Sequence, residues 1–363
     1  MRGRAKSQAF CPIPPKPCKY DYFNPTKINA FLPLSAFFTG DQVHAIGSDG
    51  AVLVRRKLRR AEVIGFFTDL PGCVVGMEAC ASAHHWAREL IALGHEVRLM
   101  PPAYVKPYVK RGKTDAADAE AICEAVMRPT MRFVAVKSVE QQAVLMVHKS
   151  RDLMVRQRTM LINALRGHLA EYGIVTGIGV GGVTAMLKAL HDQQEGLPAH
   201  ARSALHGLAA QMRALASEID RLEAQILAWH RADETSRRLA TIPGIGPITA
   251  SAISAAVPDA SLFRPGRQFA AWLGLTPRAN SSGGKERLGG ITKQGDGYLR
   301  RRLVVGATAV MRMTRKNADR QPWMAQLLER KPAKIATVAL ANKTARIAWA
   351  VMSRKEVYAA QAA

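Results

Sequence analysis

Short apolar runs separated by polar turns fill the chain from residue 42 onward. Residues 43–46 and 51–55 flank a Gly-Ser-Asp-Gly turn, a pattern typical of a β-hairpin. Amphipathic segments and apolar runs then alternate as helix, strand, helix and strand, at residues 60–70, 73–77, 84–93 and 96–100. Strands that alternate with helices favour an α/β layer with parallel crossovers.

Two long helices are predicted after this region. Residues 139–169 place Lys and Arg on one face, with Leu and Val behind it. In residues 201–230, apolar side chains recur at spacings of three and four, as in a coiled-coil seam. The seam comprises Leu205, Leu208, Met212, Leu215, Ile219, Leu222, Ile226 and Trp229. Pairing with a second copy and packing within the same chain are equally consistent with this pattern.

The C-terminal third is predicted to be mainly helical. Residues 241–250 read Thr-Ile-Pro-Gly-Ile-Gly-Pro-Ile-Thr-Ala, which resembles the turn of a helix-hairpin-helix element. In such a turn, Gly244 and Gly246 let the backbone approach a phosphate at the N-terminus of the next helix, although a tight helix connection is the alternative. A long glycine-rich loop is expected over residues 276–295.

Residues 1–41 differ from the rest of the chain. They are rich in proline and lysine up to Lys27, and Pro33 interrupts an apolar run at residues 31–38. We expect most of this segment to be disordered, because proline and charge leave little apolar surface to bury.

The net charge of the chain indicates what kind of partner it binds. Lys and Arg total 52 against 28 Asp and Glu, a net charge of +24, which indicates a polyanionic partner and favours nucleic acid. No apolar run is long enough to span a bilayer and no secretory signal is evident, so no membrane partner is expected. The five cysteines lack the spacing of a zinc site or a disulfide framework, which favours reduced thiols in a cytoplasmic protein.

Three carboxylates are candidates for chemistry. Asp115 and Asp118 follow Thr114, a good N-cap, and lie three residues apart on one face of a predicted helix. Such a pair can share a divalent metal, although the helix macrodipole favours acids in a first turn in any case. Glu78 ends a predicted parallel strand, where α/β sheets build their sites, so the three can converge on the same metal ions.

Two cationic loops accompany these acids. The loop before the acidic helix contributes Lys106, Lys110, Arg111 and Lys113, as expected of a phosphate-binding segment. The glycine-rich loop contains the adjacent Ser281 and Ser282. Its cations, with those that open the next helix, are Arg278, Lys285, Arg287, Lys293, Arg300 and Arg301. A serine is a poor nucleophile until a base or metal activates it, and cations can stabilise a phosphoryl transition state.

These motifs together resemble the insertion-sequence transposases of the DEDD class, which are guided by a structured bridge RNA. The resemblance extends from about residue 42 to residue 352. The stretches that carry it are residues 76–80 (GMEAC), 113–119 (KTDAADA), 241–246 (TIPGIG), 268–278 (QFAAWLGLTPR) and 290–295 (GITKQG).

The resemblance implies three regions after the atypical N-terminal segment. They are an α/β RNase H-like domain, an α-helical coiled-coil region, and a mainly α C-terminal transposase domain with the helix-hairpin-helix-like element. The expected boundaries are residues 1–41, 42–135, 136–235 and 236–355. The expected activity is DNA cleavage and strand exchange.

The resemblance also implies roles for individual residues. Glu78, Asp115 and Asp118 would bind Mg²⁺, and Ser282 would attack a DNA phosphodiester to form a phosphoserine link, with Ser281 as the fallback. The cations and glycines named above would contact DNA and the guide RNA. Family active sites combine the acidic domain of one protomer with the serine of another, which implies a dimer or tetramer acting on the bacterial nucleoid.

The sequence departs from this family at its first strand. A motif such as Ile-Asp-Leu-Ala-Lys, which carries the first carboxylate, is expected nine residues before His44, where the chain has Ser35. Pro33 cannot donate to the ladder of a central strand. We therefore expect an RNase H-like domain that lacks a normal first strand and one metal ligand, with residues 1–41 derived from a frameshift, a fusion or a misplaced start.

Three functions remain open from the sequence. The first is a Mg²⁺-dependent DNA transposase, complete or defective. The second is a protein that binds DNA and RNA but no longer cuts, with Asp115 and Asp118 kept as a helix cap. The third is a junction resolvase, which would share the acidic domain but would leave the serine loop unexplained.

Overall fold

The computed structural model describes residues 28–31, 41–47, 51–109, 114–192, 194–317 and 322–359. The chain divides into two compact units, Met1–Val136 and Lys137–Ala363. Among the described residues, no helix has both the length and the apolar character needed to cross a membrane.

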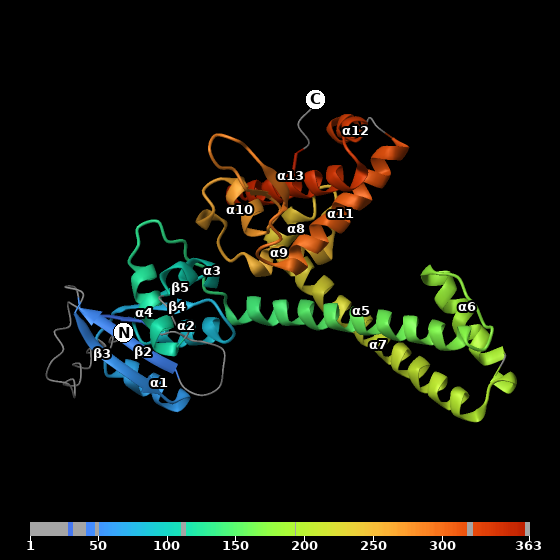
Figure 1. Ribbon diagram of the computed structural model, residues 1–363, viewed down its shortest axis with the longest axis horizontal. Coiled ribbons are helices and arrows are strands. Elements are labelled where there is room, and N and C mark those ends of the chain that lie inside the picture. The colour runs from blue at the N-terminus through green and yellow to red at the C-terminus, as the bar shows by residue number, and fades with distance from the viewer. Residues whose placement is uncertain are drawn as a thin grey trace, which may run out of the picture. The chain divides into compact units, whose positions relative to one another are not determined.

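A five-stranded sheet forms the first unit, in the order β3-β2-β1-β4-β5 (Figure 1). The strands are β1 (Ile28–Phe31), β2 (Asp41–Gly47), β3 (Val52–Leu58), β4 (Val74–Glu78) and β5 (Glu96–Met100). β2 pairs antiparallel with both β1 and β3, whereas β1, β4 and β5 run parallel. The unit is therefore an α/β domain with a mixed sheet, and parallel pairing brings the carboxyl ends of β1 and β4 to one edge.

The first strand corrects one expectation. We predicted that the domain would lack a normal first strand and that most of residues 1–41 would be disordered, yet the four-residue β1 lies at the centre of the sheet. Ala30 pairs with Ala45 of β2 on one side and with Val75 of β4 on the other. The family motif would have put this strand near Ser35, where Pro33 interrupts the ladder, whereas the chain forms β1 upstream, at residues that all have an N–H for the ladder. Residues 32–40 lie outside the described part.

Helices cover both faces of the sheet. α1 (Val63–Thr68) and α2 (Ala83–Ala92) pack over a cluster that includes Val75, and α4 (Asp115–Val126) packs over another that includes Val74. Because neighbouring strand residues point to opposite faces, the two clusters lie on opposite sides. The short helices are η1 (Arg60–Glu62), α3 (Pro102–Val105) and η2 (Lys106–Tyr108).

Two long helices open the second unit and lie side by side in Figure 1. They are α5 (Val139–Ala170) and α7 (Ala199–Ala232), with α6 (Gly179–Asp192) and η3 (Gln194–Gly196) between them. Leu205 and Met212 of the predicted seam share an apolar cluster with Leu165 and Leu169 of α5. The N-terminal half of the α7 seam therefore packs within the same chain. The sequence left this arrangement open alongside pairing with a second copy.

The remaining chain is helical, with a small hairpin. Its helices are α8 (Glu234–Leu239), α9 (Pro247–Ala256), η4 (Ala260–Leu262), α10 (Gly266–Trp272), α11 (Gly297–Lys316), α12 (Pro322–Arg330) and α13 (Ala333–Arg354). β6 (Pro277–Ala279) and β7 (Leu288–Ile291) form a two-stranded antiparallel sheet between α10 and α11. The stretch predicted as a long loop is thus partly ordered, and helices surround one core that includes Ile253, Phe269 and Leu303.

Candidate functional site

The acidic helix begins as the sequence predicts. The Thr114 hydroxyl accepts a hydrogen bond from the Ala117 N–H at 3.2 Å, and its carbonyl accepts from the Asp118 N–H at 3.0 Å. Asp115 is exposed and Asp118 half-buried, and both lie in the first turn of α4. The N-terminal end of the helix dipole favours negative charge there, so this local structure stabilises both carboxylates without a metal.

Glu78 is the last residue of β4, and its side chain is half-buried. α4 packs against β4, so the acidic helix lies in the layer next to the strand that ends in Glu78. Within the described ranges, however, no three His, Cys, Asp or Glu side chains form a group that could hold a metal ion. β1 contributes no acid either, since its sequence is Ile-Asn-Ala-Phe. The described residues therefore do not bring three such side chains together, and the expected Mg²⁺ site stays a prediction.

The cationic loop before α4 is only partly described. Lys106 is exposed within η2, and Tyr104 beside it is 44 % exposed. The guanidinium of Arg128 lies over the Tyr108 ring, 5.8 Å from its centroid. The predicted contacts at Lys110, Arg111 and Lys113 lie outside the described residues.

Ser282 stands at the tip of the hairpin between β6 and β7. Gly283 and Gly284 follow it with φ of +56° and +73°, and the Lys285 N–H donates to the Ser282 carbonyl at 3.1 Å. Two left-handed residues at the centre of a two-residue connection define a type I′ turn, which glycine allows without strain. The long glycine-rich stretch is therefore a shaped hairpin that presents exposed residues at its end.

The two adjacent serines differ in their hydrogen bonding. The Ser281 hydroxyl accepts from the Arg287 N–H at 3.1 Å, which ties it to the opposite arm of the hairpin. In the part of the chain that the structure describes, the Ser282 hydroxyl makes no hydrogen bond. Arg278, Lys285 and Arg287 are all exposed on the same hairpin. Both serines are exposed, and Ser282 is the one whose hydroxyl is not held by a hydrogen bond within the described residues.

The base of the hairpin is held by α11 and the end of α10. Arg300 donates through Nη1 to the carbonyls of Leu273 and Gln294, both at 2.9 Å. Asp296 caps α11 by accepting from the N–H groups of Tyr298 and Leu299 at 2.7 and 3.1 Å. These contacts position the hairpin relative to the helical core. They also use hydrogen-bond donors of Arg300, a residue that we predicted would contact nucleic acid.

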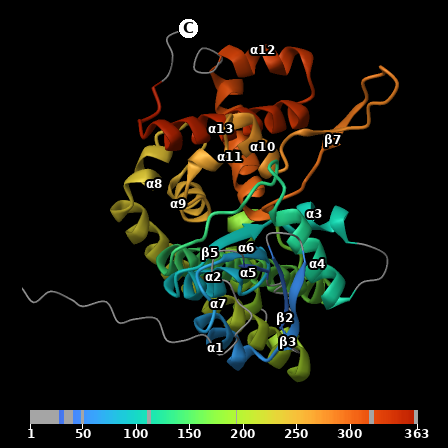
Figure 2. The same cartoon turned by 90° about the vertical axis from the view of Figure 1, so that its left-hand side faces the viewer.

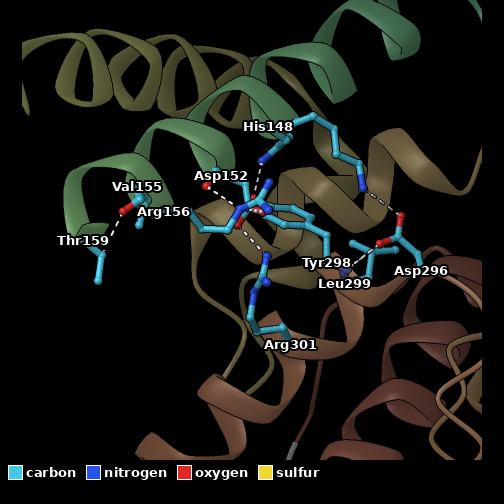
Figure 3. Close-up of polar contacts among 10 residues, drawn as sticks. His148, Asp152, Val155, Arg156, Thr159, Asp296, Tyr298, Leu299 and Arg301 are labelled. Atoms are coloured by element: carbon cyan, nitrogen blue, oxygen red, sulfur yellow. Dashed lines mark hydrogen bonds and ion pairs between the residues drawn. The ribbon is translucent and has the colours of Figure 1, made fainter. Parts of the chain in front are cut away.

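A buried polar network joins α11 to α5 (Figure 3). The Tyr298 hydroxyl donates to His148 Nδ1 at 3.0 Å, and His148 Nε2 donates to the Ser251 hydroxyl at 3.1 Å. The Ser251 proton is directed to the Ile248 carbonyl, which fixes this tautomer of the neutral imidazole. Arg301 pairs with Asp152 nearby at 2.5 Å. No sequence motif indicated this network, because a lone histidine on a basic helix gives no spacing signal.

The pKa of His148 is lowered to about 4, chiefly by burial and further by Arg302, Arg151 and Lys149. The folded protein therefore resists protonation that the unfolded chain accepts near pH 6.5. Stability from this group is fully present above pH 6.5 and is lost as the pH falls to 4, a loss of about 3 kcal/mol.

His148→Gln should make the free energy of unfolding less dependent on pH. When it is measured by urea unfolding from pH 7 to pH 4, the free energy of unfolding should fall less for His148→Gln than for the unmodified chain. Identical profiles would contradict this role.

Of the two glycines in the turn before α9, only Gly244 is in close contact with another helix. Gly244 has φ of +87°, and a Cβ at Gly306 of α11 would lie 1.8 Å from its carbonyl oxygen. A Cβ on Gly246, which precedes α9, would meet no atom within 4 Å. Close contact with α11 therefore explains Gly244 without a ligand, while Gly246 remains open to solvent.

Comparisons with known proteins define the class of the chain. Residues 42–174 match a family model described as "Transposase", of the IS110 DEDD type, and residues 236–322 match the "Transposase IS116/IS110/IS902 family". A "Probable family 20 transposase" of Pseudomonas aeruginosa is 52 % identical over 320 residues, which are 87 % of this chain and 95 % of that protein.

Two further relatives are named for insertion sequences. The "Transposase for insertion sequence element IS1111A" of Coxiella burnetii is 40 % identical over 320 residues, 87 % of this chain and 88 % of that protein. The "Transposase for insertion sequence element IS1328" of Yersinia enterocolitica is 39 % identical over 317 residues, 87 % of this chain and 94 % of that protein. The chain therefore belongs to the IS116/IS110/IS902 family of insertion-sequence transposases, as the sequence motifs indicated, and DNA is the substrate that the family implies.

Proposed function

We propose that this chain is a DNA transposase that uses Ser282 as its nucleophile. The Ser282 Oγ attacks a backbone phosphorus, an Oγ–P bond forms, one P–O bond of the backbone breaks, and the departing oxygen takes up a proton while the serine loses its own. The single observation that carries the proposal is the free, exposed hydroxyl at the tip of the type I′ turn. Lys285 and Arg287 beside it would offset charge that develops on the phosphoryl oxygens.

Glu78, Asp115 and Asp118 are the residues that we propose for contact with a divalent metal, with Mg²⁺ expected from the family. Their support is the position of Glu78 at the end of a parallel strand and of both aspartates in the first turn of α4. Because the described residues do not form a complete group of ligands, this part of the proposal rests on the resemblance and on those positions.

The central strand supports a reduced cleavage activity. β1 lies between β2 and β4, yet Ile28, Asn29, Ala30 and Phe31 include no carboxylate. We propose that strand cleavage by this chain is therefore slow compared with that of relatives that have an acid there, while nucleic-acid binding is kept. If the rate of strand cleavage is zero, the chain is a protein that binds nucleic acid without cutting it.

The partners follow from charge and from the family. The net charge of +24 and the exposed cations of the hairpin support contact with DNA and with a guide RNA. A dimer or tetramer that joins the acidic unit of one protomer to the serine hairpin of another is proposed on the resemblance. Gly246, Lys106 and Lys293 are exposed and stay in the proposed contact set.

Serine substitutions test the nucleophile. DNA that carries an element end is incubated with the protein and Mg²⁺, and covalent adducts are counted on a denaturing gel. Ser282→Ala should abolish the slow adduct formation of the unmodified chain, whereas Ser281→Ala should keep it within about threefold, because only a hydrogen bond of about 1 kcal/mol within the hairpin is lost. An adduct that survives Ser282→Ala would exclude Ser282, and DNA cutting without any adduct would favour a junction resolvase.

A further inference from the structure

The outer edge of the sheet carries a cationic strip that the serine mechanism does not use. The strip consists of Arg55, Arg56 and Lys57 on β3, followed by Arg59 and by Arg60 of η1. β3 ends the strand order, and no further strand pairs with its outer side in the described part of the chain. All five side chains are exposed.

No acid on β2 pairs with the three cations of β3. The residues paired with the three cations on β2 are Gln42, Val43 and His44, none of which is an acid. Within the described ranges no ion pair involves Arg55, Arg56 or Lys57. The carboxylate of Glu62, the nearest acid that follows, accepts from the backbone N–H of Arg59 at 2.6 Å. Like charges on neighbouring positions repel, and a bound anion would relieve that repulsion.

The geometry of the strand suits an extended polyanion. Alternate residues of a strand are about 7 Å apart, so Arg55 and Lys57 project from one face while Arg56 projects from the other. Arg60 lies over the Trp86 ring at 5.0 Å, which fixes the end of the strip against α2. Phosphates along one strand of a duplex rise by about 3.4 Å each along its axis, so Arg55 and Lys57 on one face are spaced like phosphates two steps apart.

We propose that this edge strip, Arg55 to Arg60, is a nucleic-acid backbone site, distinct from the acidic edge and from the serine hairpin. It binds phosphates of DNA or RNA and supplies affinity without reading sequence. It lies on the edge strand of the sheet and would hold the first unit on its nucleic acid independently of cleavage. The alternative is that these charges only protect an exposed sheet edge from pairing with other chains.

Binding measurements on the full chain test the strip. In the variant R55Q/R56Q/K57Q, affinity for labelled duplex DNA or for an RNA hairpin should fall at least tenfold at about 0.1 M salt. For duplex DNA the slope of log K against log salt should become shallower by about 2–3, since each phosphate contact contributes about 0.9. The nucleic acid that shows the larger loss identifies the source of the phosphates. The charge-preserving R55K/R56K should bind within about twofold of the unmodified chain.

A matched control removes the same charge elsewhere. R128Q/R221Q/R354Q also lowers the net charge by three, and two of its arginines are paired with Glu124 and Glu218 at 2.8 Å. Equal losses in the two triple variants would overturn the proposal, because the effect would then follow net charge alone. If the R55Q/R56Q/K57Q protein self-associates while its affinity for both nucleic acids is unchanged, the proposal is overturned in favour of edge protection. It is also overturned if the variant loses affinity for anionic lipid vesicles but keeps its affinity for both nucleic acids. None of these results depends on DNA cutting, so they are separable from a failure of the Ser282 proposal.

Discussion

Replacing Ser35 by aspartate is expected to raise the rate of covalent DNA adduct formation by about 100-fold. The resemblance puts the family's first carboxylate at position 35, where this chain has serine, four residues along the sequence from the end of β1 at Phe31. β1 runs parallel to β4, so their carboxyl ends share one edge, and β4 ends there in Glu78. An aspartate at position 35 would supply the further carboxylate that the resemblance implies beside Glu78, Asp115 and Asp118. Single-turnover assays with labelled DNA and Mg²⁺ measure the rate.

Ser35→Asn is the matched control for this experiment, because asparagine has the shape of aspartate without its charge. It should leave the rate within about threefold of that of the unmodified chain. Both variants should bind DNA as the unmodified chain does, since binding depends on the cations. A Ser35→Asp protein that binds normally and reacts no faster would show that the missing carboxylate does not limit cleavage.

Gly295→Ala is expected to destabilise the second unit by about 3 kcal/mol. Gly295 has φ of +78°, and a Cβ there would lie 1.8 Å from the carbonyl oxygen of Trp272. The left-handed conformation costs any other residue about 1–2 kcal/mol, and the clash forces the end of α10 away from the base of the serine hairpin. Because domains are stable by only about 5–15 kcal/mol, this loss is large. Urea unfolding followed by circular dichroism measures it.

Gly290→Ala, on the same hairpin, separates this effect from a general cost of losing glycine. A Cβ at Gly290 would meet no atom within 4 Å, and its φ is not left-handed. Its unfolding free energy should change by less than about 1 kcal/mol. Equal losses in the two variants would contradict the close contact between Gly295 and Trp272.

Local signals predicted the parts of the fold that depend on local chemistry. The hydroxyl of Thr114 and the acids after it predicted the start of α4, because capping is decided within one turn. The three-and-four spacing in α7 predicted its buried stripe, of which Leu205 and Met212 pack on α5. That spacing could not choose between a second copy and the same chain, since both bury the same apolar face.

Features set by distant residues were not predictable. β1 is only four residues long and is defined by its partners β2 and β4, so no periodicity marked it. His148 meets Tyr298 across 150 positions of sequence, and a lone histidine carries no signal of such a partner. The glycines at 283 and 284 predicted only a loop, whereas their left-handed conformations shape the turn that presents Ser282. In each case the tertiary environment gave the residue its role.

Mapping the covalent adduct tests the central claim most directly. The Ser35→Asp chain is allowed to react with DNA, the DNA is trimmed to a nucleotide, and the protein is digested and examined by mass spectrometry. The account predicts that the nucleotide phosphate is attached to Ser282 and that Ser282→Ala in the same background yields no modified peptide. Attachment to Ser281 or to the buried Tyr298 would contradict it.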